Sequence, residues 1–500
     1  MTSHPVGVAH SRSAAEVPRK AGKRRISLPS LGLRFSERKL LLLFFDVISV
    51  NAALYLALTV RPDVEMTRGI IVHQFLWFIT VSGIWITMGV ILNVYDLARA
   101  ANGLRSAWVA SGAALLTGLI YLFIPFITPE LPGRRLEALV FPLLASMGVA
   151  AWRIIYAQVF VQPVFQQRAL VIGAGWSGQT LARALTNINE RGGENSAGIG
   201  YQLLGFIDDD ERKQGLSVEG IPVLGTRRDL VELVRQLKPD ELIVAITNPQ
   251  QIHMELFQAI LDCREMGIPI TTMATLYEEL TGRVPVEHAG RNLHVVMPLN
   301  EPAVHRLYML VRRIIDLLAG VFGCILTGLI APIIWLANRF TSPGPLFYRQ
   351  ARVGRSGRTF MLIKFRSMVV DAEKEMGAVW ASEADRRVTP VGRILRKTRL
   401  DELPQFCNVL KGEMTLIGPR PERPEFVAQL DQQIPFYRVR HAVKPGLTGW
   451  AQVKYRYGAS VNDALIKLQY DLYYIKHQGP YLDLLILLKT IQVILGLKGR

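Results

Sequence analysis

Two adjacent carboxylates stand among basic residues in the segment KTRLDELPQFCNVLKGE, residues 397–413. Apolar residues recur at helical spacing after them, so Asp401 and Glu402 are predicted to lie at or just before a helix N-terminus. Acidic side chains there commonly cap the helix, because its first amides and its dipole favour negative charge. One carboxylate suffices for a cap, however. A pair beside several cations also suits phosphoryl chemistry, in which one carboxylate is the nucleophile and its neighbour holds Mg²⁺.

Side chains that suit phosphate binding occur in other short segments of the C-terminal third. Arg420 lies in the turn GPRP, where two prolines restrict the backbone and the guanidinium can bind phosphate through two hydrogen bonds. Lys364 and Arg366 share one face of the alternating segment FMLIKFRSM, and Asp471 stands among tyrosines in KLQYDLYYIKH. Each of these side chains also fits an ordinary exposed position, so the segments are informative only together.

The apolar residues of the chain are concentrated in its first third, which indicates membrane helices. Half of all residues are hydrophobic, and the mean hydropathy is +0.23. Each of four apolar runs is long enough to cross about 30 Å of hydrocarbon, so we expect a four-helix transmembrane region over residues 39–162. The runs are Leu40–Val60, Ile70–Leu92, Ser106–Thr128 and Leu136–Phe160.

A basic leader, residues 1–38, precedes the first run and is predicted to be disordered, because it is rich in Ser, Pro and Gly with little periodicity. Its Lys and Arg residues place the N-terminus in the cytoplasm, and four spans return the chain to that side. The net charge of +17 accompanies no zinc spacing or RNA-binding signature, so we expect no nucleic-acid partner. Attraction to an anionic leaflet and to phosphorylated substrates accounts for the charge better. The three cysteines form no pair motif, which fits a reducing compartment.

After the apolar runs, residues 166–285 alternate between strand and helix patterns, which predicts an α/β domain with a parallel sheet. Its first strand ends in GAGWSG, where Gly173, Gly175 and Gly178 match the G-x-G-x-x-G pattern of dinucleotide sites. The next candidate acid, Asp208, comes thirty-five residues after Gly173, whereas that pattern expects about 20. We favour glycines that allow close helix–sheet packing, with a nucleotide site as the alternative.

A fifth apolar run, Leu317–Ala337, contains Pro332 and has basic residues on both flanks. Because basic flanks face the cytoplasm and an internal proline disrupts a helix, we expect a re-entrant helix over residues 312–338 that breaks at Pro332. The alternative is an ordinary tilted span that tolerates the proline.

The C-terminal segments, taken in order, resemble the bacterial sugar transferase family, whose members are monotopic phosphoglycosyl transferases that start lipid-linked polysaccharide assembly. The resemblance covers residues 305–500, and the preceding portion is similar to that of long-form polyprenyl-phosphate hexose-1-phosphate transferases, such as undecaprenyl-phosphate glucose phosphotransferases. It implies four transmembrane helices, a Rossmann-like cytoplasmic accessory domain, a re-entrant membrane helix and a mixed α+β catalytic domain. The segments are SPGPLFYRQARVG, KFRSM, RLDELPQFCNVLKGEMTLIGPRP, KPGLTGWAQV and YDLYYIK.

The resemblance also implies roles for individual residues. Asp401 would be the nucleophile that takes the sugar phosphate, and Glu402 would support Mg²⁺ and the geometry of Asp401. Pro332 would break the re-entrant helix; many members have Ser where this chain has Ala331, which removes a hydroxyl at the break. The residues that would bind substrate are Lys364, Arg366, Arg396, Arg420 and Asp471.

The function implied is transfer of hexose 1-phosphate from a UDP-hexose, expected to be UDP-glucose, to undecaprenyl phosphate. UMP would leave, and the product would start an exopolysaccharide or capsule repeat unit. The enzyme would be a multi-pass, homo-oligomeric protein of the bacterial cytoplasmic membrane, in contact with membrane lipids, with its catalytic domain in the cytoplasm. Alternatives are a galactose 1-phosphate transferase, an NAD-dependent sugar-nucleotide enzyme acting through the α/β domain, and a non-enzymatic scaffold. Residues 166–300 contain no Tyr-x-x-x-Lys pair, which argues against the NAD enzyme.

Overall fold

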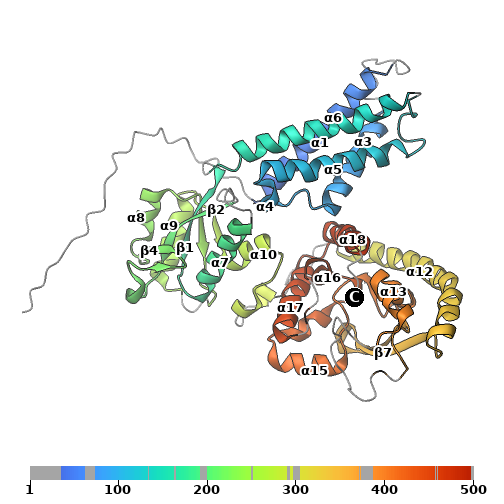
Figure 1. Cartoon of the computed structure of the whole chain (residues 1–500). Coiled ribbons are helices and arrows are strands. Elements are labelled where there is room, and N and C mark those ends of the chain that lie inside the picture. The colour runs from blue at the N-terminus through green and yellow to red at the C-terminus, as the bar shows by residue number, and fades with distance from the viewer. Residues whose placement is uncertain are drawn as a thin grey trace, which may run out of the picture.

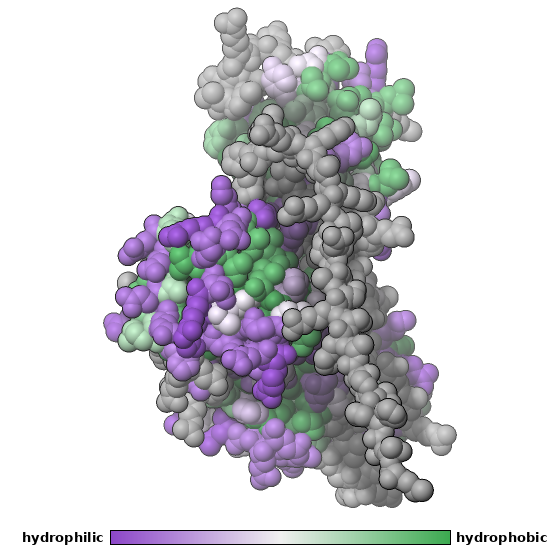
Figure 2. Space-filling view, turned by 90° about the vertical axis from the view of Figure 1, so that its left-hand side faces the viewer, coloured by the Kyte–Doolittle hydropathy of each residue, from purple (hydrophilic) through white to green (hydrophobic). Residues whose placement is uncertain are grey.

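The computed structural model describes most of the chain as three parts: a helical bundle, an α/β domain and a C-terminal domain (Figure 1). The predicted leader lies almost wholly outside the described residues. Figure 2 shows hydrophilic side chains over much of the visible face of the α/β domain and apolar ones on the bundle above it. The described residues are 35–61, 74–132, 134–162, 165–191, 200–248, 252–289, 293–296, 305–370, 372, 387–455, 458 and 460–496.

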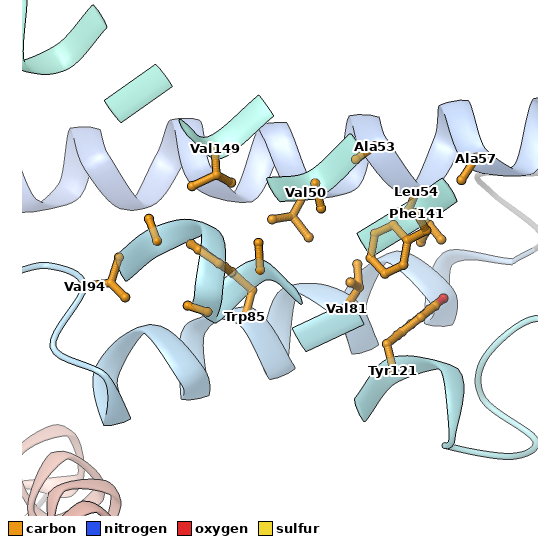
Figure 3. Close-up of a cluster of buried hydrophobic side chains, with 14 of the residues drawn as sticks. Val50, Ala53, Leu54, Ala57, Val81, Trp85, Val94, Tyr121, Phe141 and Val149 are labelled. Atoms are coloured by element: carbon orange, nitrogen blue, oxygen red, sulfur yellow. The ribbon is translucent and has the colours of Figure 1, made fainter. Parts of the chain in front are cut away.

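The N-terminal helices pack into a bundle whose core combines small and aromatic side chains (Figure 3). Tyr121 and Phe141 meet edge-on with ring centroids 5.4 Å apart. By length and composition, α1, α5 and α6 qualify as membrane spans, while α3 is apolar but shorter, with 17 residues. The predicted run Ile70–Leu92 begins outside the described residues. The bounds are α1 Phe35–Thr59, α3 Phe75–Ile91, α4 Leu97–Ala100, α5 Gly103–Leu122 and α6 Arg135–Val159.

A buried ion pair explains the charge that interrupts the fourth apolar run. Arg153 of α6 pairs with Asp46 of α1, and both side chains are completely buried. Arg153 also donates a hydrogen bond to the carbonyl oxygen of Val94 at 3.1 Å. Because an unpaired buried charge costs several kcal/mol, each of the two charges requires the other.

Helix α1 begins earlier than the predicted end of the disordered leader. Its first residue is Phe35, inside the predicted 1–38 segment. The side chain of Arg38 is buried and donates to the carbonyl oxygens of Phe160 and Phe165, beyond the end of α6. These bonds fix the start of α1 against the end of α6, so the leader is shorter than predicted.

The α/β domain contains a six-stranded sheet in the order β3-β4-β2-β1-β5-β6, in which all pairs except β3–β4 are parallel. Residues of β1 alternate between two apolar clusters, one formed with α7 and α10 and the other with α8 and α9. Helices therefore cover both faces. The bounds are β1 Gln167–Ile172, α7 Trp176–Arg191, β2 Tyr201–Ile207, β3 Ser217–Val218, β4 Ile221–Gly225, α8 Leu230–Leu237, β5 Glu241–Val244, α9 Met254–Glu265, β6 Ile270–Thr272, α10 Met273–Thr281 and α11 Leu293–Val296.

The C-terminal domain begins with α12, one long helix that contains Pro332 and also qualifies as a membrane span. Figure 1 shows α12 curving around the domain toward β7. Whether its path through a bilayer is re-entrant stays a prediction. The bounds are α12 His305–Thr341, β7 Phe347–Val353, β8 Thr359–Phe365, α13 Pro390–Thr398, α14 Gln405–Lys411, β9 Thr415–Ile417, α15 Pro424–Gln433, β10 Gly446–Thr448, α16 Trp450–Lys454, α17 Val461–Lys476 and α18 Pro480–Leu495.

Glycines let α12 lie directly against α14, the short helix that follows the acidic pair. A Cβ atom added at Gly323 would lie 2.1 Å from Cγ of Phe406. Arg313 of α12 donates hydrogen bonds of 3.0 Å to the last carbonyl oxygens of α14, at Val409 and Leu410. The long apolar helix therefore fixes the element that carries the predicted chemistry.

Two of the three cysteines meet at this contact, although they form no motif in the sequence. The sulfur atoms of Cys324 on α12 and Cys407 on α14 lie 3.1 Å apart, and both cysteines are free thiols. Their eighty-three-residue separation concealed the contact, because only the packing of α12 on α14 creates it.

Candidate active site

A cavity of about 750 Å³ opens in the C-terminal domain between the β7–β8 hairpin, α13, the acidic turn and α17. All seven predicted catalytic and substrate-binding residues of this domain line it. The hairpin and α17 thus contribute residues, Lys364 and Asp471, that are more than one hundred positions apart in the sequence. These residues are Lys364, Arg366, Arg396, Asp401, Glu402, Arg420 and Asp471.

The two carboxylates lie in a 3₁₀ turn, Leu400–Glu402, just before α14, as the helical spacing predicted. Arg399 ends α13 in the left-handed conformation with φ of 61° and redirects the chain into this turn. Neither carboxylate caps α14, whose N-cap residue is Pro404. The capping interpretation therefore does not explain the pair.

Glu402 is surrounded by three cationic side chains. Its Oε1 accepts a hydrogen bond from Nη2 of Arg420 at 2.8 Å and lies 3.5 Å from Arg399 and 3.9 Å from Lys364. Burial alone would raise the pKa of Glu402, but Arg420, Lys364 and Arg399 outweigh it and lower the pKa to about 2. Glu402 is therefore ionised at neutral pH and holds three cations in place.

Asp401 has a different environment although it is the adjacent residue. Its side chain is 7% exposed, and no group within the described part of the chain donates a hydrogen bond to Oδ1. Burial and the negative charge of Glu402 raise the pKa of Asp401 to about 6. A pair of acids whose pKa values are pushed apart is typical of sites that assign the two groups different roles. Asp401 is therefore the acid that keeps a carboxylate oxygen without a hydrogen-bond partner among the described residues, and this oxygen is buried in the cavity wall.

Arg420 is positioned by a buried ion pair behind the GPRP turn. Nη2 of Arg440 donates to the carbonyl oxygen of Arg420 at 3.0 Å and to Oδ2 of Asp471 at 2.8 Å. Both members of the pair are buried. Burial raises the pKa of Asp471 to about 6, although Arg440 opposes this effect. In this geometry Asp471 supports Arg440 and, through it, Arg420; the predicted contact with substrate stays a prediction.

The other predicted basic residues occupy different places in the cavity wall. Lys364 faces Glu402, and burial lowers its pKa to about 8 in spite of that carboxylate. Arg366 donates to the carbonyl oxygens of Pro345 and Ser342, which form the connection that follows α12. These bonds give Arg366 a structural role. Arg396 lines the cavity on the side of Asp401.

Sequence reasoning missed Arg440 and Arg399 as parts of this site. Arg440 stands in the segment FYRVRHA, where nothing distinguishes it from a surface residue, and only the packing of α17 on that segment reveals its partner. Arg399 was recognised only as a neighbour in sequence, because its contact with Glu402 depends on the left-handed turn.

A magnesium ion in this cavity would need ligands from the substrate as well as from the protein. Among the residues that the structure describes, no group of three or more His, Cys, Asp or Glu side chains converges. Asp401 offers its unpartnered Oδ1, whereas Oε1 of Glu402 already faces three cations. Because Mg²⁺ is commonly held by one or two carboxylates plus substrate phosphates, the residues fit a metal bound with the donor.

The glycine turn of the α/β domain is occupied by groups of the protein itself. A Cβ added at Gly178 would lie 2.1 Å from the carbonyl oxygen of Gly173, whose φ is 103°, while Gly175 has open space. The amide of Ala174 donates to Asp208 at 2.7 Å, although Asp208 is thirty-five residues from Gly173. This geometry supports a packing role for the glycines; nucleotide binding stays a prediction.

Two family models match the chain. The family model described as bacterial sugar transferase matches residues 307–496, and the model described as CoA-binding domain matches residues 90–271. The chain is 42% identical over 265 residues to the UDP-N-acetylgalactosamine-undecaprenyl-phosphate N-acetylgalactosaminephosphotransferase of Aeromonas hydrophila, a match that covers 52% of this chain and 61% of that protein.

Two longer matches include more of the N-terminal region. The chain is 31% identical over 364 residues to the UDP-glucose:undecaprenyl-phosphate glucose-1-phosphate transferase of Escherichia coli (strain K12), covering 68% of this chain and 74% of that protein. It is 27% identical over 502 residues to the UDP-galactose-lipid carrier transferase of Erwinia amylovora, covering 92% and 97%. The chain therefore matches less than two thirds of the length of the Aeromonas protein, namely 61%.

Proposed function

The chain belongs to the bacterial sugar transferase family, and we propose that it transfers a hexose 1-phosphate from a UDP-hexose to undecaprenyl phosphate with release of UMP. The observation that carries the proposal is the contrast within the acidic pair. Asp401 lines a basic cavity and has a buried carboxylate oxygen without a hydrogen-bond partner among the described residues, while Glu402 is ionised and holds Arg420 and Lys364 beside it. This arrangement suits attack on a phosphate that carries negative charge.

In the first half-reaction, a carboxylate oxygen of Asp401 attacks the phosphorus that bears the sugar. The bond from this phosphorus to the bridging oxygen breaks, and UMP leaves with that oxygen and its electron pair. The product on the protein is a hexosyl-phosphoryl ester of Asp401. No proton is transferred, so the step requires only that Asp401 be ionised.

In the second half-reaction, a phosphate oxygen of undecaprenyl phosphate attacks the same phosphorus. The bond between phosphorus and Asp401 breaks, which restores the carboxylate and yields undecaprenyl-diphospho-hexose. Splitting one displacement into two lets the nucleotide leave before the lipid phosphate arrives. The same cationic side chains, Lys364, Arg396 and Arg420, then neutralise the phosphates of both substrates in turn.

Mg²⁺ is part of the proposal: Asp401, Glu402 and the donor phosphates would supply its oxygen ligands. When bound, the ion would neutralise charge on the phosphate oxygens. The side chains keep their own tasks: Glu402 orders the cations, and Arg420 orients the sugar phosphate. The ion's ligands on the protein would be few, in agreement with the absence of a three-residue cluster in the described segments.

The donor sugar is proposed to be glucose, with galactose as the alternative. The relatives are named for transfer of N-acetylgalactosamine, glucose and galactose, so their names support sugar transfer more than any one sugar. We further propose that the protein lies in the bacterial cytoplasmic membrane, forms homo-oligomers, has its catalytic domain in the cytoplasm and starts an exopolysaccharide repeat unit. In support, four helices of the described chain are long and apolar enough to span a membrane.

The deciding experiment follows radiolabelled sugar from UDP-hexose into lipid in membranes that contain undecaprenyl phosphate. Asp401→Asn should abolish UMP release and lipid labelling, whereas Asp431→Asn, a half-exposed acid on α15, should leave both unchanged. Trapping with donor alone should give a sugar-phosphate adduct at Asp401. Equal lipid labelling in Asp401→Asn and the wild type would refute the assignment, and UDP-glucose, UDP-galactose and UDP-N-acetylgalactosamine in parallel identify the sugar.

A further inference from the structure

One side of the cavity is apolar, in contrast to its basic floor. Pro345, Phe347, Val369 and Val370 line this side, and we call them the apolar rim. Phe347, Val369 and Val370 are 43%, 46% and 51% exposed. Apolar side chains that remain this exposed beside a polar cavity are typical of a surface that receives an apolar ligand.

The apolar rim adjoins the end of the membrane helix α12. A Cβ added at Gly344, three residues after α12 ends, would lie 2.9 Å from Cγ2 of Val370, so the rim packs on the connection that leaves α12. The last turns of α12 carry exposed apolar side chains at helical spacing, Ile333, Leu336 and Phe340. In Figure 1, β7 is the next element after this helix, and β7 begins with Phe347.

The distribution of charge in the cavity separates two kinds of surface. Lys364, Arg396 and Arg420 lie on the side of Asp401, where a phosphate would react. The four rim residues are uncharged, although Arg366 and Arg387 line the cavity beside them. Arg366 also fixes the connection that leads to the rim, because it donates to the carbonyl oxygens of Pro345 and Ser342. A ligand that touches both surfaces must therefore combine a phosphate with an apolar chain.

We propose that the apolar rim binds the first isoprene units of the lipid acceptor and guides its phosphate from the bilayer to Asp401. This inference rests on the proposed function and extends it to the path of one substrate. UDP-hexose has no apolar chain to place there, whereas undecaprenyl phosphate must bring its phosphate out of the hydrocarbon past the end of α12. The rim is continuous with that helix, so the chain stays in contact with apolar surface along the path.

The test separates the two half-reactions in the full-length enzyme, reconstituted in lipid nanodiscs. Val370→Ser should raise the KM for undecaprenyl phosphate at least about fourfold, since one buried methylene contributes about that factor to affinity. Val370→Ile, which keeps the apolar contact and adds one methylene, should not raise the KM. Val461→Ser is the matched control, because Val461 is a partly exposed valine on α17 that does not line the cavity.

UMP release from donor alone should be the same in all of these variants and the wild type, because the donor does not touch the rim. An unchanged KM in Val370→Ser, an equal rise in Val461→Ser, or a parallel loss of donor-only UMP release would each overturn the inference. Failure of the proposed function itself would look different: the wild type would then release no UMP from donor alone.

Discussion

At the scale of single residues, Asp401 and Glu402 show how two neighbouring acids acquire different properties. Glu402 meets three cations and stays ionised far below neutral pH, whereas Asp401 is buried beside a like charge and has one carboxylate oxygen without a hydrogen-bond partner among the described residues. Lys364 interacts electrostatically with both carboxylates, and its lowered pKa limits the pH range in which it is charged. Together these shifts define a pH window for the first half-reaction.

We predict a bell-shaped pH profile for UMP release from donor alone. The pKa of Asp401 is raised to about 6, so the reactive carboxylate is lost as the pH falls through that value. The pKa of Lys364 is lowered to about 8, so its charge is lost as the pH rises through 8. Single-turnover rates of UMP release, measured below, between and above these two pKa values, test both declines. Lys364→Arg should remove the alkaline decline and keep the acidic one; an alkaline decline that persists would contradict the role of Lys364.

Sequence alone drew attention to the acidic pair because its members are adjacent and their charge pattern is unusual. It also drew attention to Arg420, whose turn contains two prolines, and the structure places all three residues in the wall of one cavity. It missed Arg440, because the bond from Arg440 to the carbonyl oxygen of Arg420 joins residues that only the tertiary fold brings together. Which charged side chains lie within bonding distance depends on tertiary packing, and no short segment of sequence shows that packing.

At the scale of elements, the apolar runs predicted the helices well, because length and composition decide whether a segment can lie in hydrocarbon. Their ends were less predictable. Helix α1 begins at Phe35, and hydrogen bonds from Arg38 hold this end in place. The sequence did not show this, because the partners of Arg38 lie more than one hundred and twenty residues away. The contact between Cys324 and Cys407 likewise depends on α12 packing against α14. Contacts between elements, unlike the elements themselves, required the structure.

Gly323 provides a test of how α12 positions the acidic turn. A Cβ there would lie 2.1 Å from Cγ of Phe406, so Gly323→Ala should push α12 and α14 apart and displace Asp401. We predict a fall in UMP release of about tenfold or more, since small misplacements of a reacting group are costly. Gly328→Ala, at a glycine of α12 with no neighbour within 4 Å, should keep wild-type activity. Equal rates in both variants, measured with donor alone, would refute this positioning role.

At the scale of the whole molecule, the α/β domain is joined to the C-terminal domain by a continuous set of polar contacts. Nε1 of Trp450 donates to the carbonyl oxygen of Gly282 at 2.9 Å, and Val284 donates to Gln469 at 3.0 Å. Trp450 begins α16, and Gln469 lies two residues before Asp471 on α17. The α/β domain therefore contacts the same helix that supports Arg440 and, through it, Arg420.

The centre of this interface is Glu278 of α10, a buried carboxylate that lies 2.8 Å from both Lys476 and His477 of the C-terminal domain. Glu278→Gln removes the negative charge beside Lys476 and His477. The side chain of Lys476 then lacks its ionic partner at this interface. We predict faster hydrogen exchange in α10 and at the end of α17 and a lower unfolding temperature. Glu279→Gln, at the exposed neighbouring acid, should change neither, because surface charges contribute at most about 1 kcal/mol. If exchange in α17 is unaltered in Glu278→Gln, the two domains are held together by their apolar contacts instead.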